Sequence, residues 1–177
     1  MSTATVPQYT RVGVWGGGAL AAIVAGLAMG LVMHFGAGLI ELLGGLAPVP
    51  GESVISGWTI HLLISVAFGL AFAVCVSRAA ICQQVRDFTD LALAGIAYGA
   101  FIGVVAGGVV FPVAMTRADV ATLPLPFLPL PGAAGELVAA VIFAIGHLVY
   151  GFVLGATFAT INGLTPAGRF ERFAVLD

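Results

Sequence analysis

Four long apolar stretches dominate the sequence and constrain its fold more than any other feature. They cover about residues 12–35, 56–77, 91–115 and 137–163, and each reaches the ~20 residues that a helix needs to cross a bilayer. Backbone polar groups in lipid must be hydrogen-bonded within the protein, which favours helices. The sequence therefore predicts an all-α integral membrane four-helix bundle, with residues 1–177 forming a single transmembrane domain.

The composition agrees with lipid as the main solvent. Hydrophobic residues make up 60% of the chain and charged residues 8%, against about 25% charged residues in a soluble domain. The net charge is −2, there is no lysine, and the arginines are scattered, so nothing resembles a phosphate-binding stripe. The lipid bilayer is the expected partner, and nucleic acid is not. The first stretch is also too long for a secretory signal peptide, so we expect it to be retained.

The arginines predict the orientation. Four crossings place both termini on one side, and five of the six arginines fall on that side, leaving Arg117 on the other. The positive-inside rule then places both termini in the cytoplasm. Loops 36–55 and 116–136 would be external, and the tail 164–177 cytoplasmic.

Small residues recur at a spacing of four within the stretches, a pattern that lets helix axes approach closely in lipid. The ladder is most regular in the third stretch, which we expect to be the most tightly packed or to supply an oligomer interface. The predicted packing residues are Gly26, Gly30, Gly69, Gly95, Gly99, Gly103, Gly107, Gly151 and Gly155.

The two halves of the chain resemble each other. The second stretch matches the fourth at an offset of 86 residues, which pairs His61 with His147, and the first matches the third at an offset of 73, which pairs Gly26 with Gly99. Each half holds two spans, so the halves point the same way across the membrane. The sequence thus predicts two parallel two-helix repeats related by an axis along the membrane normal.

The paired histidines are the one constellation that could carry chemistry. An imidazole within a membrane span is costly and normally faces the bundle interior or a water-filled cavity. The two histidines should lie at comparable depth below the outer surface, with a third at the outer end of the first stretch. The candidate polar membrane site comprises His61, His147, His34, Tyr150, Tyr98 and Ser65.

Three interpretations of the histidine pair compete. In the favoured one, each imidazole donates a hydrogen bond to a neighbouring helix and fixes the packing register. In the second, His61 and His147 line a path for protons or a small solute, helped by the tyrosines and the serine. In the third, both histidines ligate the iron of a b-type haem, although Arg117 is the one external arginine available to its propionates.

Local signals predict three further features. Asp90 is a candidate N-cap for the third helix. Pro112 should kink that helix or end it near its outer side. The apolar part of loop 36–55 could form a short interfacial helix that ends at a proline turn.

No catalytic motif accompanies the spans. The few serines, histidines and carboxylates match neither a nucleophile arrangement nor a metal-binding H-E-x-x-H signature, so we do not expect an enzyme, and no cofactor other than haem is considered. The favoured function is a structural or interaction subunit of a homo-oligomer or a larger membrane complex. Transport of a small solute or proton is the first alternative, and haem-based electron transfer the second.

The segment His147-Leu-Val-Tyr150-Gly151-Phe-Val-Leu-Gly155 carries a resemblance to a known group. Its H-L-x-Y-G-x-x-x-G pattern, echoed weakly at His61-Leu62, looks like that of uncharacterised small four-helix integral membrane proteins of prokaryotes. The resemblance implies the same fold and a multi-pass location in a prokaryotic plasma membrane. It implies no activity.

Overall fold

The computed structural model describes residues 9–46, 52–119 and 132–166, and all regular secondary structure in these ranges is helical. Four candidate spans, long and apolar enough to cross a membrane, are present as predicted: Gly13–Ala37, Ser53–Val76, Phe88–Arg117 and Ala133–Ile161. Their elements are η1 (Gly13–Gly17) with α1 (Gly18–Ala37), α3 (Ser53–Val76), α5 (Phe88–Val105) with η2 (Ala106–Val110) and α6 (Phe111–Arg117), and α7 (Ala133–Ile161).

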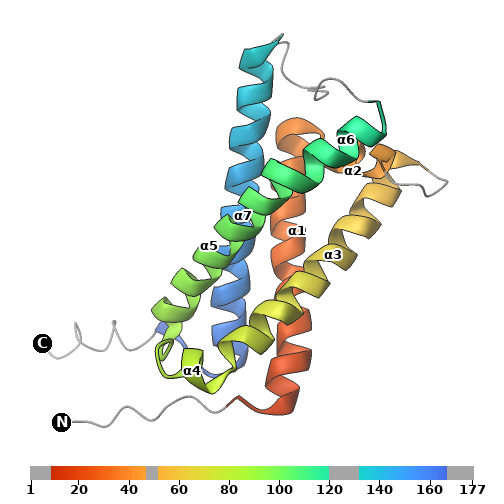
Figure 1. Cartoon of the computed structure of the whole chain (residues 1–177). Coiled ribbons are helices and arrows are strands. Elements are labelled where there is room, and N and C mark those ends of the chain that lie inside the picture. Colours follow the sequence, from red (N-terminus) through yellow and green to blue (C-terminus); the bar gives the residue numbers. More distant parts are fainter. Residues whose placement is uncertain (1–8, 47–51, 120–131, 167–177) are drawn as a thin grey trace, which may run out of the picture.

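The bundle is built around two neighbouring helices. The helices α1 and α7 run side by side, while α3 packs on α1 and α5 packs on α7 (Figure 1). The beginning of the first span meets the end of the fourth, where Gly13 lies against Asn162. The first span therefore begins, and the fourth span ends, at the same end of the helical bundle.

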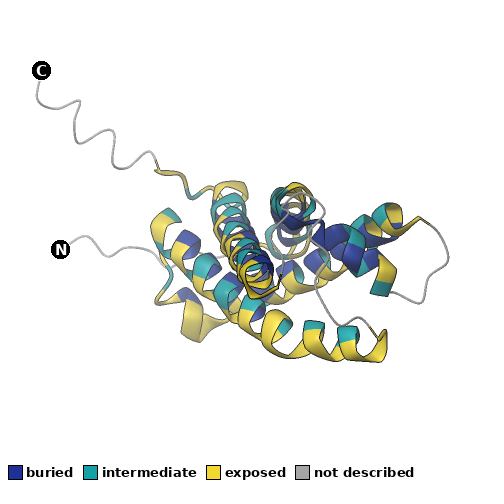
Figure 2. Cartoon of the chain, turned by 90° about the horizontal axis from the view of Figure 1, so that it is seen from above, coloured by how far each residue is buried: buried dark blue, intermediate teal, exposed yellow. Residues whose placement is uncertain are grey.

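A short helix, α2 (Leu39–Leu46), follows α1 after Gly38, which ends α1 in the left-handed conformation at φ 60°. It folds back on the first turns of α3, where Gly44 meets the Ser53 carbonyl and Gly57 meets the Ile40 carbonyl. These contacts place backbone against backbone, so a side chain larger than hydrogen would not fit at either glycine. The predicted short helix is present, and its buried residues pack within the protein (Figure 2). The proline turn predicted after it lies outside the described residues.

The start of the third span corrects one prediction. The N-cap is Asp87, not Asp90, because a carboxylate oxygen of Asp87 accepts a hydrogen bond of 2.8 Å from the Asp90 backbone N–H. Asp90 in turn accepts a bond of 2.9 Å from the Arg86 backbone N–H. The two carboxylates thus satisfy donors on both sides of the helix start, as in a capping box. The short helix α4 (Ala79–Cys82) lies in the connection just before.

The sequence predicts that Pro112 kinks the third helix or ends it, and the helix does not end there but continues to Arg117. Proline has no N–H, and in a regular α-helix the carbonyl four residues earlier would lose its donor. Here the chain widens to a π-helix over Ala106–Val110, which ends two residues before the proline. π turns occur mostly as single turns of this kind within longer α-helices.

The glycines of the third span do not make it the most tightly packed helix. In its most apolar stretch 11% of the residues are buried, against 44% in the first span and 33% in each of the other two. Figure 2 shows the exposed side of the long helix that contains η2 and α6. Close packing is confined to α5, because the axis then diverges from α7 (Figure 1).

Where α5 does contact α7, backbone meets backbone. A Cβ atom built on Gly95 would collide with the Gly151 carbonyl, and one on Gly99 with the His147 carbonyl. A Cβ on Gly155 would likewise collide with the Leu91 carbonyl. Backbone atoms cannot move aside without shifting a whole helix, so these positions determine how closely α5 and α7 approach.

We predict that Gly99→Ala destabilises the protein, because the new methyl group collides with the His147 carbonyl and pushes the helices apart. Overpacking of this kind costs roughly 1–3 kcal/mol. Equilibrium unfolding of the detergent-solubilised protein by increasing mole fraction of sodium dodecyl sulfate, followed by circular dichroism, measures the loss. The control is Gly108→Ala on the same span, where a Cβ meets no atom within 4 Å. Equal effects of the two substitutions would contradict the packing argument.

Candidate functional site

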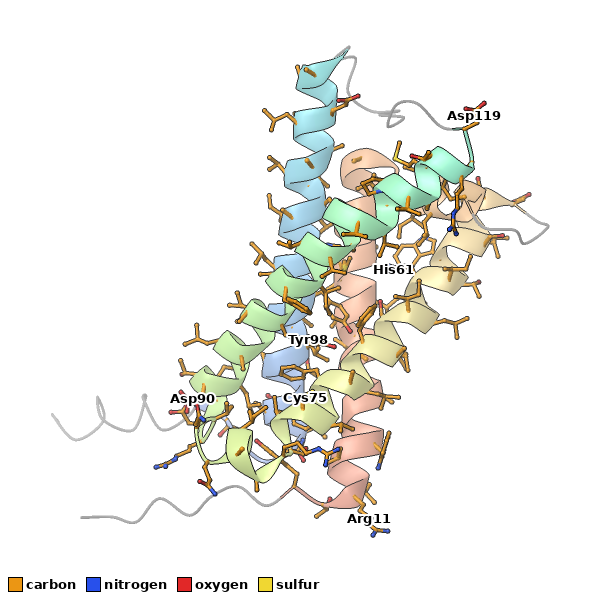
Figure 3. The ribbon with its side chains drawn as sticks, in the orientation of Figure 1. Arg11, His61, Cys75, Asp90, Tyr98 and Asp119 are labelled. Carbon is orange, nitrogen blue, oxygen red and sulfur yellow. The ribbon has the colours of Figure 1, made fainter. Side chains whose placement is uncertain are left out.

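His61 lies in the interior between α3 and α1 (Figure 3). Its Nε2 atom is 2.8 Å from the carbonyl oxygen of Gly26. A carbonyl can only accept, so Nε2 carries the proton and donates. The residue is 6% exposed. Its bond joins two different spans, through residues that are 35 positions apart in the sequence.

His147 is equally buried, at 4% exposed, but bonds differently. Its Nδ1 atom donates to the carbonyl of Phe143 in its own helix, at 2.9 Å. The imidazole also lies against the Phe143 ring, with centroids 4.3 Å apart. Nε2 of His147 makes no hydrogen bond to any described residue. The two histidines therefore use different nitrogen atoms and different kinds of partner.

Each histidine faces a glycine of the preceding span. A Cβ on Gly30 would lie 3.2 Å from Cδ2 of His61, and a Cβ on Gly103 would lie 3.0 Å from Cβ and Cγ of His147. A larger residue at either glycine would press on the imidazole. The ring of each histidine is thus positioned by a small residue on the neighbouring helix.

His34 is connected to His61 by the ring of Trp58, a residue that was not among the predicted site residues. Trp58 lies between the two imidazoles, with its ring centroid 6.0 Å from that of His34 and 6.0 Å from that of His61. Nδ1 of His34 is 3.9 Å from a carboxylate oxygen of Glu41 on α2. Trp58 could have been found from its spacing, because residues three apart share a helix face. The structure thus groups His34, Trp58 and His61 at one end of the bundle.

The two tyrosines of the predicted site join helices that are distant in sequence. The Tyr150 hydroxyl donates to the Ser65 carbonyl at 2.6 Å, and the Tyr98 hydroxyl donates to the Phe68 carbonyl at 2.8 Å. Both acceptors belong to α3. Ser65 enters the site through its backbone, while its side chain lies where a Cβ on Gly26 would collide with it. The tyrosines therefore fasten α7 and α5 to α3.

A cavity of about 650 Å³ borders His147. It is half-open, and it lies between the third span from Ala100 to Met115 and the part of α7 from Ala139 to Leu148, with Leu39 at its edge. Apart from His147, every lining residue is apolar. His61 is not among them. The sequence pattern did not indicate this cavity, because it arises where α6 diverges from α7.

The described residues contain no group of three or more histidine, cysteine, aspartate or glutamate side chains that could hold a metal ion. Searches of the chain against protein-family models, curated proteins and solved structures find no match. The interpretation of the site therefore rests on its own geometry.

We predict that Tyr150→Phe lowers the free energy of unfolding, because it deletes the bond between helices and leaves the Ser65 carbonyl only its bond within α3. Hydrogen bonds between membrane helices average ~0.6 kcal/mol and reach ~1.7 kcal/mol. Unfolding in sodium dodecyl sulfate measures the change. The control is Thr160→Val, whose hydroxyl bonds to Ala156 within its own helix and should contribute less. A Tyr150→Phe protein as stable as the parent would mean that the bond contributes nothing net.

Proposed function

We propose that this protein is a non-enzymatic integral membrane subunit that associates with a second copy of itself through the third span. The observation that carries the proposal is a row of apolar side chains spaced four apart along that span. It consists of Phe101, Val105, Val109 and Val113, whose exposed fractions range from 41% to 65%. We call these four residues the valine row.

The valine row is suited to a helix contact. Residues four apart lie on one side of a helix and form a continuous ridge. Valine in a helix has essentially one χ1 rotamer, so packing it costs little side-chain entropy. In a two-fold symmetric dimer the same ridge meets its own copy, and one surface then supplies both halves of the interface. The low burial of this span within the monomer leaves the ridge accessible.

The interior polar groups support a structural role for the rest of the bundle. His61, Tyr98 and Tyr150 each donate to a backbone carbonyl on another helix. Groups bonded in this way fix helix register, as the favoured interpretation of the histidines requires. They are also engaged with the backbone, which gives a proton or solute path through the same residues less support.

The haem alternative also gains little from the geometry. Bis-histidine ligation requires a free ring nitrogen on both imidazoles, directed at one iron. Each imidazole keeps one ring nitrogen outside its hydrogen bond, Nδ1 of His61 and Nε2 of His147, but only His147 lines the cavity, so the two do not face one shared space there. A haem would have to displace at least the contacts that Trp58 and Gly103 make with these rings.

The proposed parallel repeats are supported by equivalent contacts in the two halves. Gly26 faces Ser65 in the first half, and Gly99 faces Gly151 in the second. These pairs correspond at the sequence offsets of 73 and 86. The His61 contact with the Gly30 position and the His147 contact with the Gly103 position correspond in the same way. We propose that one two-helix unit was duplicated, with its helix-packing face retained.

Site-directed cross-linking in native membranes tests the dimer. In a background with Cys75→Ser and Cys82→Ala, Val109→Cys places a thiol in the middle of the valine row. We predict that mild oxidation converts most of this variant to a disulfide-linked dimer, visible on a non-reducing gel, because the two-fold axis brings the same residue of both copies together.

The controls place a thiol on other exposed faces. Leu63→Cys on α3 and Leu137→Cys on α7 start from residues that are 66% and 65% exposed, and both should stay monomeric under the same oxidation. Comparable cross-linking at all three positions would indicate random collision. Absence of a dimer at Val109, together with a monomeric mass by native mass spectrometry, would overturn the proposal.

A further inference from the structure

We infer that the cavity beside His147 binds a lipid-soluble molecule whose aromatic ring carries a hydroxyl group, and that this hydroxyl donates a hydrogen bond to Nε2 of His147. The inference does not depend on self-association. The lining residues of the third span include Gly103, Gly107 and Gly108, and none belongs to the valine row.

The cavity has the size and composition of a small-molecule site. Its volume of about 650 Å³ falls within the range of roughly 300–1,000 Å³ typical of ligand pockets, which are mostly apolar with a few placed polar groups. It is half-open within a candidate span, so a ligand dissolved in the bilayer could enter without crossing water. The divergence of α6 from α7 forms its two walls (Figure 1).

The walls of the cavity combine small residues with aromatic rings. One wall carries the glycines at 103, 107 and 108, and the opposite wall carries the alanines at 139, 140 and 144. Gly108 faces open space, whereas Gly103 and Gly107 lie against His147 and Phe143. Three rings border the cavity in a row, with centroid distances of 5.6 Å from Phe111 to Phe143 and 4.3 Å from Phe143 to His147. Aromatic rings pack favourably in offset or edge-to-face arrangements at such distances.

The histidine determines which polar group the ligand needs. Because Nδ1 of His147 donates to the Phe143 carbonyl, Nδ1 holds the proton and Nε2 of the neutral imidazole is an acceptor. The residue is 4% exposed and lies among apolar neighbours. Nε2 makes no hydrogen bond to a described residue, and it is not among the fully buried unpaired atoms, so it is accessible from the cavity. A polar atom left unpaired in such surroundings is unfavourable. A ligand hydroxyl would satisfy it, whereas a ketone or ether oxygen would not.

The test compares two probes that differ in one proton donor. The alkylphenol para-octylphenol carries the hydroxyl, and its methyl ether para-octylanisole has the same ring and tail without it. We measure binding of each to the purified chain in lipid nanodiscs by native mass spectrometry, and we record nitrogen NMR spectra of protein labelled at histidine. The phenol should bind about five-fold more tightly than the ether, the effect of one net hydrogen bond. Only the phenol, and not the ether, should shift the His147 Nε2 resonance.

Two variants test the location. Ala144→Phe places a ring inside the cavity from an exposed position, and it should reduce phenol binding at least ten-fold. The matched control, Ala71→Phe, adds the same ring to an exposed position on α3 that does not line the cavity, and should bind like the parent. His147→Phe keeps a ring of similar size without the acceptor, and should bind the phenol and the ether equally.

Each contrary outcome overturns the inference. Equal affinity of the parent protein for phenol and ether, without a change at Nε2, would show that His147 does not select a hydroxyl. Unchanged phenol binding in Ala144→Phe would place the probe elsewhere on the bundle. If Ala144→Phe abolishes binding of both probes while the parent does not distinguish them, the cavity takes a purely apolar molecule. None of these results affects the cross-linking at Val109.

Discussion

Backbone contact between α5 and α7 is the constraint on which the rest of the structure depends. At Gly95, Gly99 and Gly155 no atom separates one helix from the carbonyl groups of the other. In lipid there is little hydrophobic force between helices, so packing at this distance is a main source of association. It also determines where α7 presents His147. With α5 held this close, Gly103 lies directly against the imidazole.

Three polar side chains of the spans are bonded to the backbone of another helix. His61 donates to α1, and the long side chains of Tyr98 and Tyr150 reach from α5 and α7 to carbonyls of α3. The bonds are spread over three helix pairs, α3 with α1, α3 with α5 and α3 with α7. Glycine contacts bring the helices together, and these hydrogen bonds join helices that are distant in sequence.

The sequence predicted the four spans, because length and hydropathy decide them almost alone. It predicted His61, Tyr98 and Tyr150 as candidate polar residues within the spans, but it could not say which carbonyl each would reach, since that depends on helix rotation. The N-cap was misassigned because Asp87 and Asp90 are both acceptable caps, and tertiary geometry selects between them. The glycine ladder of the third span led to the prediction that this helix is the most tightly packed or supplies an oligomer interface. The structure uses its first half for contact and its second half for a cavity wall.

The π turn over Ala106–Val110 determines the direction in which the side chains after it project from the third span. A π turn contains one residue more than a regular turn, and each residue of an α-helix advances the direction of the side chains by about 100°. Winding the same residues as a regular α-helix would rotate Phe111 and Pro112 by about 100° relative to α5 and move them out of the cavity wall. The cavity is therefore encoded in the winding of this one turn as much as in the identity of the residues that line it.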